Sequence, residues 1–174
     1  MTLQRLALFS MLLTAGIASA ATPVLTNLRP QGIQRGTEME VVLNGARFTD
    51  AKELLFYGPG VTVVDFKVVN DAQVKVKLKA APDCRLGEHA VRLVAASGLT
   101  ELRTFYVGPL PIAQEKEPNN ELGTAQAIPL NTTVCGTVES EDVDYFKVTA
   151  KKGQRLSVEV EGMRLGNTNF DPSV

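Results

Sequence analysis

The sequence predicts an all-β protein built from two consecutive β-sandwich domains. Short stretches in which apolar and polar residues alternate recur from residue 24 onward, and this period of two is typical of half-buried strands. Glycine, proline, asparagine and aspartate separate these stretches at regular intervals, as turns require. With 174 residues, 44% of them hydrophobic, the chain is long enough to form one large or two small cores.

Residues 1–20 have the pattern of a secretory signal peptide. Arg5 provides the positive charge, residues 6–17 are mostly apolar, and Ala18-Ser19-Ala20 matches a cleavage site with small residues. The alternative is an N-terminal membrane anchor, but the apolar run is short for a membrane span. We therefore expect export to the periplasm, the cell surface or the medium, with no stable membrane insertion after cleavage.

Residues 21–107 are predicted to form the first sandwich. The seven expected strands are residues 24–28, 38–43, 53–57, 61–69, 73–78, 88–95 and 100–107. Asn44-Gly45 predicts a tight turn after the second strand, and the Arg29-Pro30-Gln31-Gly32 stretch predicts another. In residues 73–78 lysines alternate with Val74, Val76 and Leu78, so one face of that strand is expected in the core and the other in water.

Four short motifs of this first domain resemble an immunoglobulin-like domain of the IPT/TIG type. They are VLTNLRP at residues 24–30, Arg35-Gly36, VLNGARF at residues 42–48, and GEHAVRL at residues 87–93. The resemblance implies an immunoglobulin-like β-sandwich and no specific ligand.

The stretch 108–114 is predicted to be a linker. It contains two prolines within three positions, Pro109 and Pro111, which favour an extended, semi-rigid chain with few ladder hydrogen bonds. After it, residues 132–138 and 145–149 are predicted strands, and residues 151–154 a hairpin turn. Leu156, Val158 and Val160 are expected to share a buried face. Asn120 could cap a short helical turn before Pro129.

The second domain carries three motifs in order: EKEPNN at residues 115–120, DVDYF at 142–146 and KKGQ at 151–154. Their order and spacing resemble the bacterial pre-peptidase C-terminal (PPC) domain, a small jelly-roll-like β-sandwich of exported proteins. The resemblance implies that residues 115–174 are the N-terminal, incomplete part of such a domain, which would continue through further strands. It also implies an exported protein of the planctomycete type, in which the two domains occur together.

The acidic residues of this second domain suggest a calcium site. Residues 115–174 hold ten acidic and six basic side chains, and Ca²⁺ takes six to eight oxygen ligands from carboxylates and carbonyls. The resemblance extends to the related collagen-binding domains of bacterial collagenases, which bind calcium. It implies the following ligands: Glu115, Glu117, Asn119, Asn120, Glu141 and Asp144. Asn120 departs from the usual acidic residue and should weaken the site. The alternative is a solvated acidic turn that binds no metal.

We expect no enzymatic activity. The one histidine, His89, lies within a predicted strand, and no nucleophile elbow, zinc-protease motif or phosphate-binding glycine loop is present. Cys84 and Cys135 fall in different predicted domains and are expected to be separate thiols, the alternative being a disulfide. The net charge of −1 argues against a nucleic-acid partner.

The sequence therefore predicts a non-catalytic exported binding or spacer module of a cell-surface or secreted protein. Its partner would be an extracellular protein or polysaccharide. A second hypothesis is a calcium-dependent recognition module for a fibrous protein or a polysaccharide. A third is the leader-proximal accessory region of a secreted hydrolase or peptidase whose catalytic domain is not in this sequence.

Overall fold

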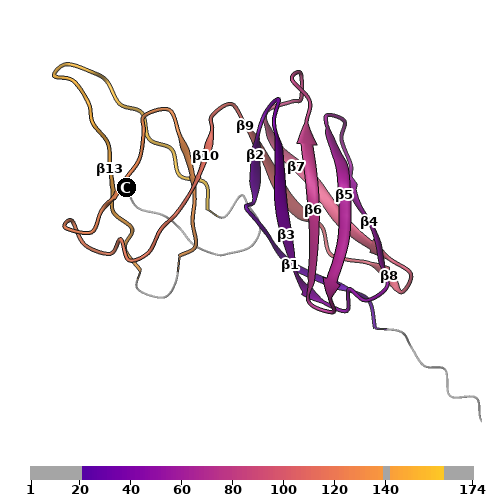
Figure 1. Cartoon of the computed structure of the whole chain (residues 1–174). Helices are drawn as coiled ribbons and strands as arrows, with labels where there is room; N and C mark the ends of the chain where they lie inside the picture. The colour runs from indigo at the N-terminus through magenta and orange to yellow at the C-terminus, as the bar shows by residue number, and fades with distance from the viewer. Residues whose placement is uncertain (1–20, 139–141, 163–174) are drawn as a thin grey trace, which may run out of the picture.

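The computed structural model describes residues 21–138 and 142–162, and within these ranges all regular structure is β-strand (Figure 1). The predicted all-β fold is therefore confirmed. The predicted signal peptide, residues 1–20, lies outside the described residues. In the part of the chain that the structure describes, no helix is long and apolar enough to cross a membrane.

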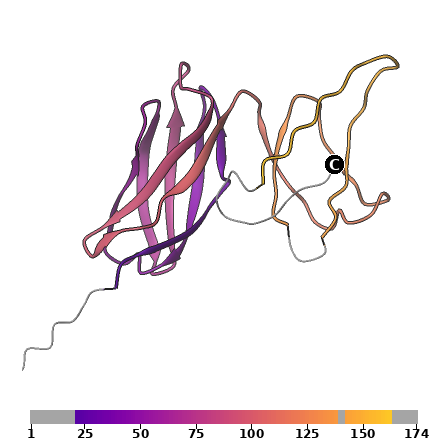
Figure 2. The ribbon, with the colours of Figure 1, turned by 180° about the vertical axis from the view of Figure 1, so that it is seen from behind.

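Residues 24–108 form two facing sheets (Figures 1 and 2). The first is antiparallel and has the order β1 (Val24–Arg29), β3 (Glu38–Ala46), β6 (Gln73–Ala80) and β5 (Val61–Asn70). The second has the order β2 (Gly32–Gln34), β9 (Arg103–Gly108), β7 (Gly87–Ala95) and β4 (Ala51–Phe56), with β8 (Gly98–Leu99) paired to β7. All pairings in the two sheets are antiparallel except β2 with β9.

The core between the sheets follows the predicted alternation. In β6, Val74, Val76 and Leu78 are buried while the lysines between them are exposed. The Phe56 and Phe105 rings meet edge to face across the second sheet, with centroids 5.8 Å apart. Burial of these apolar side chains is the main stabilising contribution to the first sandwich.

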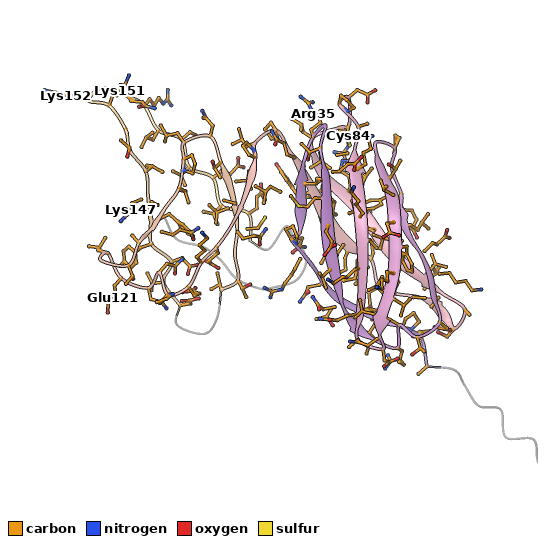
Figure 3. All side chains as sticks on the ribbon, in the orientation of Figure 1. Arg35, Cys84, Glu121, Lys147, Lys151 and Lys152 are labelled. Atoms are coloured by element: carbon orange, nitrogen blue, oxygen red, sulfur yellow. The ribbon has the colours of Figure 1, made fainter. Side chains whose placement is uncertain are left out.

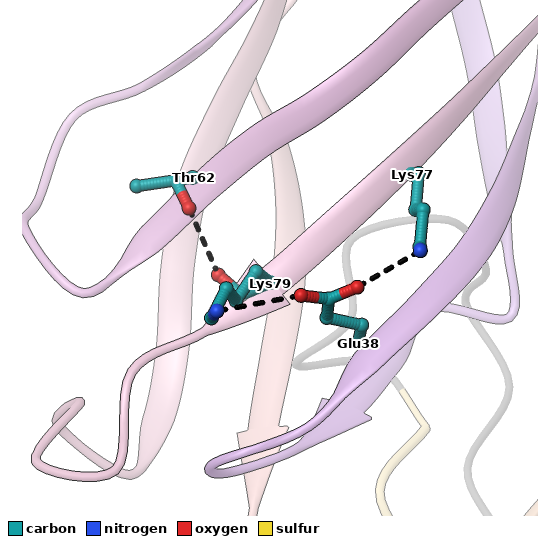
Figure 4. A network of polar contacts seen from close by, with 4 residues as sticks. All are labelled: Glu38, Thr62, Lys77 and Lys79. Atoms are coloured by element: carbon teal, nitrogen blue, oxygen red, sulfur yellow. Dashed lines mark hydrogen bonds and ion pairs between the residues drawn. The ribbon is translucent and has the colours of Figure 1, made fainter.

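The solvent face of the first sheet carries charged pairs between neighbouring strands (Figure 4). Lys77 and Lys79 approach the two oxygens of Glu38 at 2.9 and 3.4 Å. Hydrogen bonds from Lys77 and Lys79 lower the pKa of the Glu38 carboxyl, and hydrogen bonding to Glu38 raises the pKa of Lys77. Because these groups are solvated, they keep this face soluble and add little to the stability.

One of the two turns predicted in the first sandwich is wrong. Asn44-Gly45 is not a turn, because β3 continues to Ala46 and pairs with β1. A Cβ on Gly45 would lie 1.9 Å from the carbonyl oxygen of Val24, so this glycine allows close strand contact instead of a turn. The turn predicted at residues 29–32 is confirmed, since the chain bends at Pro30-Gln31 between β1 and β2; Gly32 starts β2, whose pairing with β9 joins positions over 70 residues apart.

The second part of the chain has short parallel ladders. Strand β10 (Ile112–Gln114) pairs with β12 (Thr133–Cys135), and β11 (Gln126–Ala127) pairs with β13 (Phe146–Lys147). Three of the seven residues predicted as a linker therefore form a strand. The strands predicted at 132–138 and 145–149 are shorter than expected, and a turn stands where a helical turn was suggested after Asn120.

The prediction for residues 156–160 is wrong. Leu156, Val158 and Val160 are 45%, 72% and 42% exposed, and their segment pairs with no strand in the described residues. The alternating apolar side chains of this segment have no apolar surface to pack against, so they stay exposed. Residues 148–161, which we call the arm, run out from the short ladders to a tip at Lys151 and Lys152 and then back toward the ladders (Figures 1 and 3).

Candidate metal centre

Two segments of the second part bring acidic side chains together. Glu115 follows β10 directly, Glu117 and Asn119 lie in the loop after it, and Asp144 lies two residues before β13. The backbone N–H of Tyr145 donates to the carbonyl oxygen of Asn119 at 2.9 Å, which joins the two segments next to Asp144. The site is thus built by contacts between residues more than 20 positions apart.

Carboxylate oxygens of Glu115, Glu117 and Asp144 all lie within 4.8 Å of one another. Asn119 is fully buried beside them, and its Nδ2 donates to Glu115 Oε1 at 3.2 Å. Its backbone N–H donates to Glu117 Oε2 at 2.9 Å, and that of Thr137 donates to Glu115 Oε2 at 2.8 Å. These bonds fix the two glutamates in place while leaving the oxygens of all three carboxylates close together.

The cluster is electrostatically strained. Burial raises the pKa of Asp144 to about 6, with further contributions from the negative charges of Glu115, Asp142 and Glu117 and from a hydrogen bond with Glu115. None of the three clustered carboxylates forms an ion pair with a lysine or arginine among the described residues. At neutral pH such a group is stabilised by a proton or by a bound cation.

Two buried oxygens at the cluster have no hydrogen-bond partner within the described residues: Oδ1 of Asn119 and Oδ1 of Asp144. A buried polar atom left without a partner costs about 1–3 kcal/mol, so each requires an explanation. A cation among the three carboxylates would supply a partner for Asp144, whereas Asn119 directs its Nδ2 toward Glu115. Three carboxylates are hard oxygen donors, which is the ligand type of Ca²⁺. The residues present therefore fit a calcium ion.

The structure brings together four of the six residues predicted from the sequence: Glu115, Glu117, Asn119 and Asp144. Asn120 is not among them, because its Nδ2 donates to Asp142 Oδ1 at 2.9 Å and its Oδ1 accepts from the backbone of Asn119. Glu141 lies outside the described residues.

Sequence reasoning missed Gly136. A Cβ there would lie 2.4 Å from Glu115 Oε2, so only glycine admits that carboxylate. The one available signal was a glycine inside the strand predicted at residues 132–138, which marks a close approach or the end of a strand.

A second group of reactive side chains lies in the first sandwich. Cys84 and Cys135 are separate thiols, as predicted, and Cys84 Sγ lies 3.8 Å from His89 Nε2. That nitrogen is 2.8 Å from the carbonyl oxygen of Arg85, which can only accept, so Nε2 carries a proton and cannot take one from Cys84. Burial also raises the pKa of the Cys84 thiol. The pair lacks the arrangement that activates a cysteine nucleophile.

His89 also borders an open hollow of about 610 Å³ on the surface of the sandwich, together with Tyr57 and Glu88. Half of the Tyr57 side chain is exposed there. Among the described residues, no group of buried polar atoms without hydrogen-bond partners lines this hollow. The acidic cluster is therefore the better candidate site.

Comparison with known proteins gives little beyond the fold. No family model matches the chain, and no curated protein matches it. Among solved structures, the chain is similar to the surface glycan-binding protein SGBP-B of the mixed-linkage glucan utilization locus of Bacteroides ovatus, determined in complex with a mixed-linkage heptasaccharide. The sequence identity is 14% and the TM-score 0.35, and the match covers 57% of this chain and 23% of that protein.

Proposed function

We propose that this chain is a non-catalytic binding or spacer module of an exported protein, and that its second part binds Ca²⁺. The observation that supports the calcium site is the cluster of Glu115, Glu117 and Asp144, whose carboxylate oxygens lie within 4.8 Å of one another beside a buried Asp144 Oδ1 that has no partner in the described residues. An acidic turn that binds no metal would need bound water to satisfy these buried oxygens.

Glu115, Glu117, Asn119 and Asp144 would hold the ion. When bound, Ca²⁺ supplies positive charge that offsets the repulsion among the carboxylates. The loop after β10 would thereby be joined to the segment before β13, two stretches that otherwise meet through short ladders. The ion would therefore order the second part of the module for contact with a partner, for which we propose an extracellular protein or a polysaccharide.

Calorimetric titration with Ca²⁺, with Mg²⁺ as the comparison, tests the site. Heat should be released or absorbed on adding Ca²⁺, and the melting temperature of the second part should rise. A ligand at 100 times its Kd adds about 2.7 kcal/mol to the free energy of unfolding. Mg²⁺ should bind less well, because it requires a small octahedral site.

A matched pair of variants locates the binding. Glu117→Gln removes one carboxylate of the cluster, and Glu53→Gln removes an exposed carboxylate from β4. Only the first should weaken the response to Ca²⁺. No heat and no change in melting temperature at millimolar Ca²⁺ would remove the calcium site from the proposal.

A further inference from the structure

The hollow beside Tyr57 and His89 is formed by small residues in the middle of the second sheet. The backbone N–H of Tyr57 donates to the carbonyl oxygen of Ala90 at 3.0 Å, and Ala90 pairs with Thr104 of β9. The three side chains therefore lie in one row on the same face of the sheet. Because Ala90 and Thr104 are small, they leave the tyrosine ring uncovered, and Tyr57 is 57% exposed.

The rim of this hollow is held in place without a ligand. After β4 the chain approaches the segment before β7 so closely that a Cβ on Gly60 would lie 2.5 Å from Cys84 Sγ. Within that segment the Arg85 guanidinium donates to the carbonyl oxygen of Glu88, and His89 Nε2 donates to the carbonyl oxygen of Arg85 at 2.8 Å. A site that is already formed binds with a smaller loss of conformational entropy.

Several hydrogen-bonding groups of the hollow have no partner in the protein. Asp83 and Glu88 form no ion pair among the described residues. His89 is only 3% exposed and donates through Nε2, so its Nδ1 is an acceptor in the neutral ring. Within the described part of the chain no donor reaches this Nδ1, which lies 3.9 Å from the place of a Cβ on Gly58, another residue of the hollow. The hollow therefore offers three acceptors to a ligand.

The charges and the size of the hollow favour an uncharged sugar. Arg85 lines the hollow together with the two carboxylates, so a ligand of either net charge would face a like charge there. Sugar hydroxyl groups carry no charge and can donate to the acceptors, while the C–H face of the sugar ring packs against Tyr57. Leu102, which is 46% exposed, adds a second apolar side chain. A volume of about 610 Å³ is the size of a small-ligand site, whereas a protein partner needs a surface of about 800 Å² on each side.

We propose that this hollow binds uncharged sugar units of a polysaccharide. The ring of one sugar unit lies on Tyr57, and its hydroxyl groups donate to Asp83, Glu88 and His89 Nδ1. The site lies in the first sandwich, at residues that take no part in the acidic cluster. It specifies the polysaccharide partner of the proposed function and does not depend on the calcium site.

Isothermal titration calorimetry of the full chain in EGTA tests the site with five hexasaccharides. Cellohexaose, xylohexaose and mannohexaose are uncharged, hexagalacturonate is anionic, and the hexamer of chitosan is cationic. At least one of the uncharged sugars should bind measurably at millimolar concentration. The two charged sugars should bind more weakly, because each brings a charge next to a like charge of the hollow.

Matched variants locate the binding. Tyr57→Ala should weaken it about tenfold or more, as truncation of a central aromatic contact does, and Tyr57→Phe should retain most of the affinity because the ring remains. Leu99→Ala, which shortens an apolar side chain that is 47% exposed outside the hollow, should change nothing. Glu88→Gln should weaken binding, whereas Glu53→Gln should not. The melting temperature of Tyr57→Ala should equal that of wild type, since the side chain is exposed.

Three results would overturn the proposal: no binding of any uncharged hexasaccharide, binding of the charged ones alone, or binding that Tyr57→Ala leaves intact. Because every titration is made in EGTA, such a failure would not touch the calcium site. Conversely, sugar binding in EGTA together with no response to Ca²⁺ would contradict only the calcium site.

Discussion

Replacing Asp144 by asparagine should have opposite effects on stability with and without calcium. The pKa of Asp144 in the folded chain is about 6, against 3.8 for an ordinary aspartate. The unfolded chain therefore releases this proton more readily, and the free energy of unfolding falls as the pH rises from about 4 to 6. The full difference corresponds to about 3 kcal/mol, which solvent screening of the partly exposed side chain reduces to about 1–2 kcal/mol.

Without divalent cations, Asp144→Asn should therefore be more stable than wild type at pH 7.5 by about 1–2 kcal/mol, and equally stable at pH 3.5. In millimolar Ca²⁺ the order should reverse, because the variant loses one charged ligand. Differential scanning calorimetry at both pH values, in EGTA and in Ca²⁺, measures all four differences, with Glu53→Gln as the control.

The reasoning would be refuted if Asp144→Asn were the less stable form at pH 7.5 in EGTA. It would also be refuted if the difference between variant and wild type did not change with pH, because the proton on Asp144 would then play no part.

Three further substitutions or reagents test the packing. Gly45→Ala should lower the free energy of unfolding, measured by urea titration, by more than about 3 kcal/mol, since its Cβ would overlap the carbonyl oxygen of Val24. Gly123→Ala has open space around it and should change the free energy of unfolding by no more than about 0.5 kcal/mol. Phe105→Ala should cost about 3–5 kcal/mol by the same measurement, because this ring is fully buried. Cys84 should resist Ellman's reagent in the native protein and react in urea, because burial shields the thiol and raises its pKa; rapid native labelling would contradict that account.

Most strands of the first sandwich could be predicted because each carries its own alternation. Strand β6 is the clearest case, with lysines on one face and Val74, Val76 and Leu78 on the other. Strand β2 could not be found, because three residues hold no period and their pairing with β9 is set by distant parts of the chain. Asn44-Gly45 is a sequence typical of a turn, but here it lies within β3, because β1 pairs with this part of the strand and approaches Gly45 closely.

The candidate site was predicted in its ligand types but not in its geometry. Glu115, Glu117, Asn119 and Asp144 carry the oxygen donors that calcium prefers, and this chemistry is visible in the sequence. The sequence does not show which of the neighbouring side chains point toward the site. The loop conformation directs the Asn120 side chain to Asp142 instead. Alternation at 155–161 predicted a strand with a buried face, and the structure has neither there, because alternation alone does not show whether an apolar surface lies opposite.

The parallel pairing of β2 with β9 has a mechanical consequence. The two strands run in the same direction, held at their ends by hydrogen bonds from Tyr106 to Gln31 at 2.9 Å and from Arg35 to Gly108 at 2.8 Å. Tension applied between the start of β1 and the end of β9 pulls these strands along their length, so their bonds must rupture together and not one after another. A sandwich closed in this way resists stretching along the line that joins the start of β1 to the end of β9.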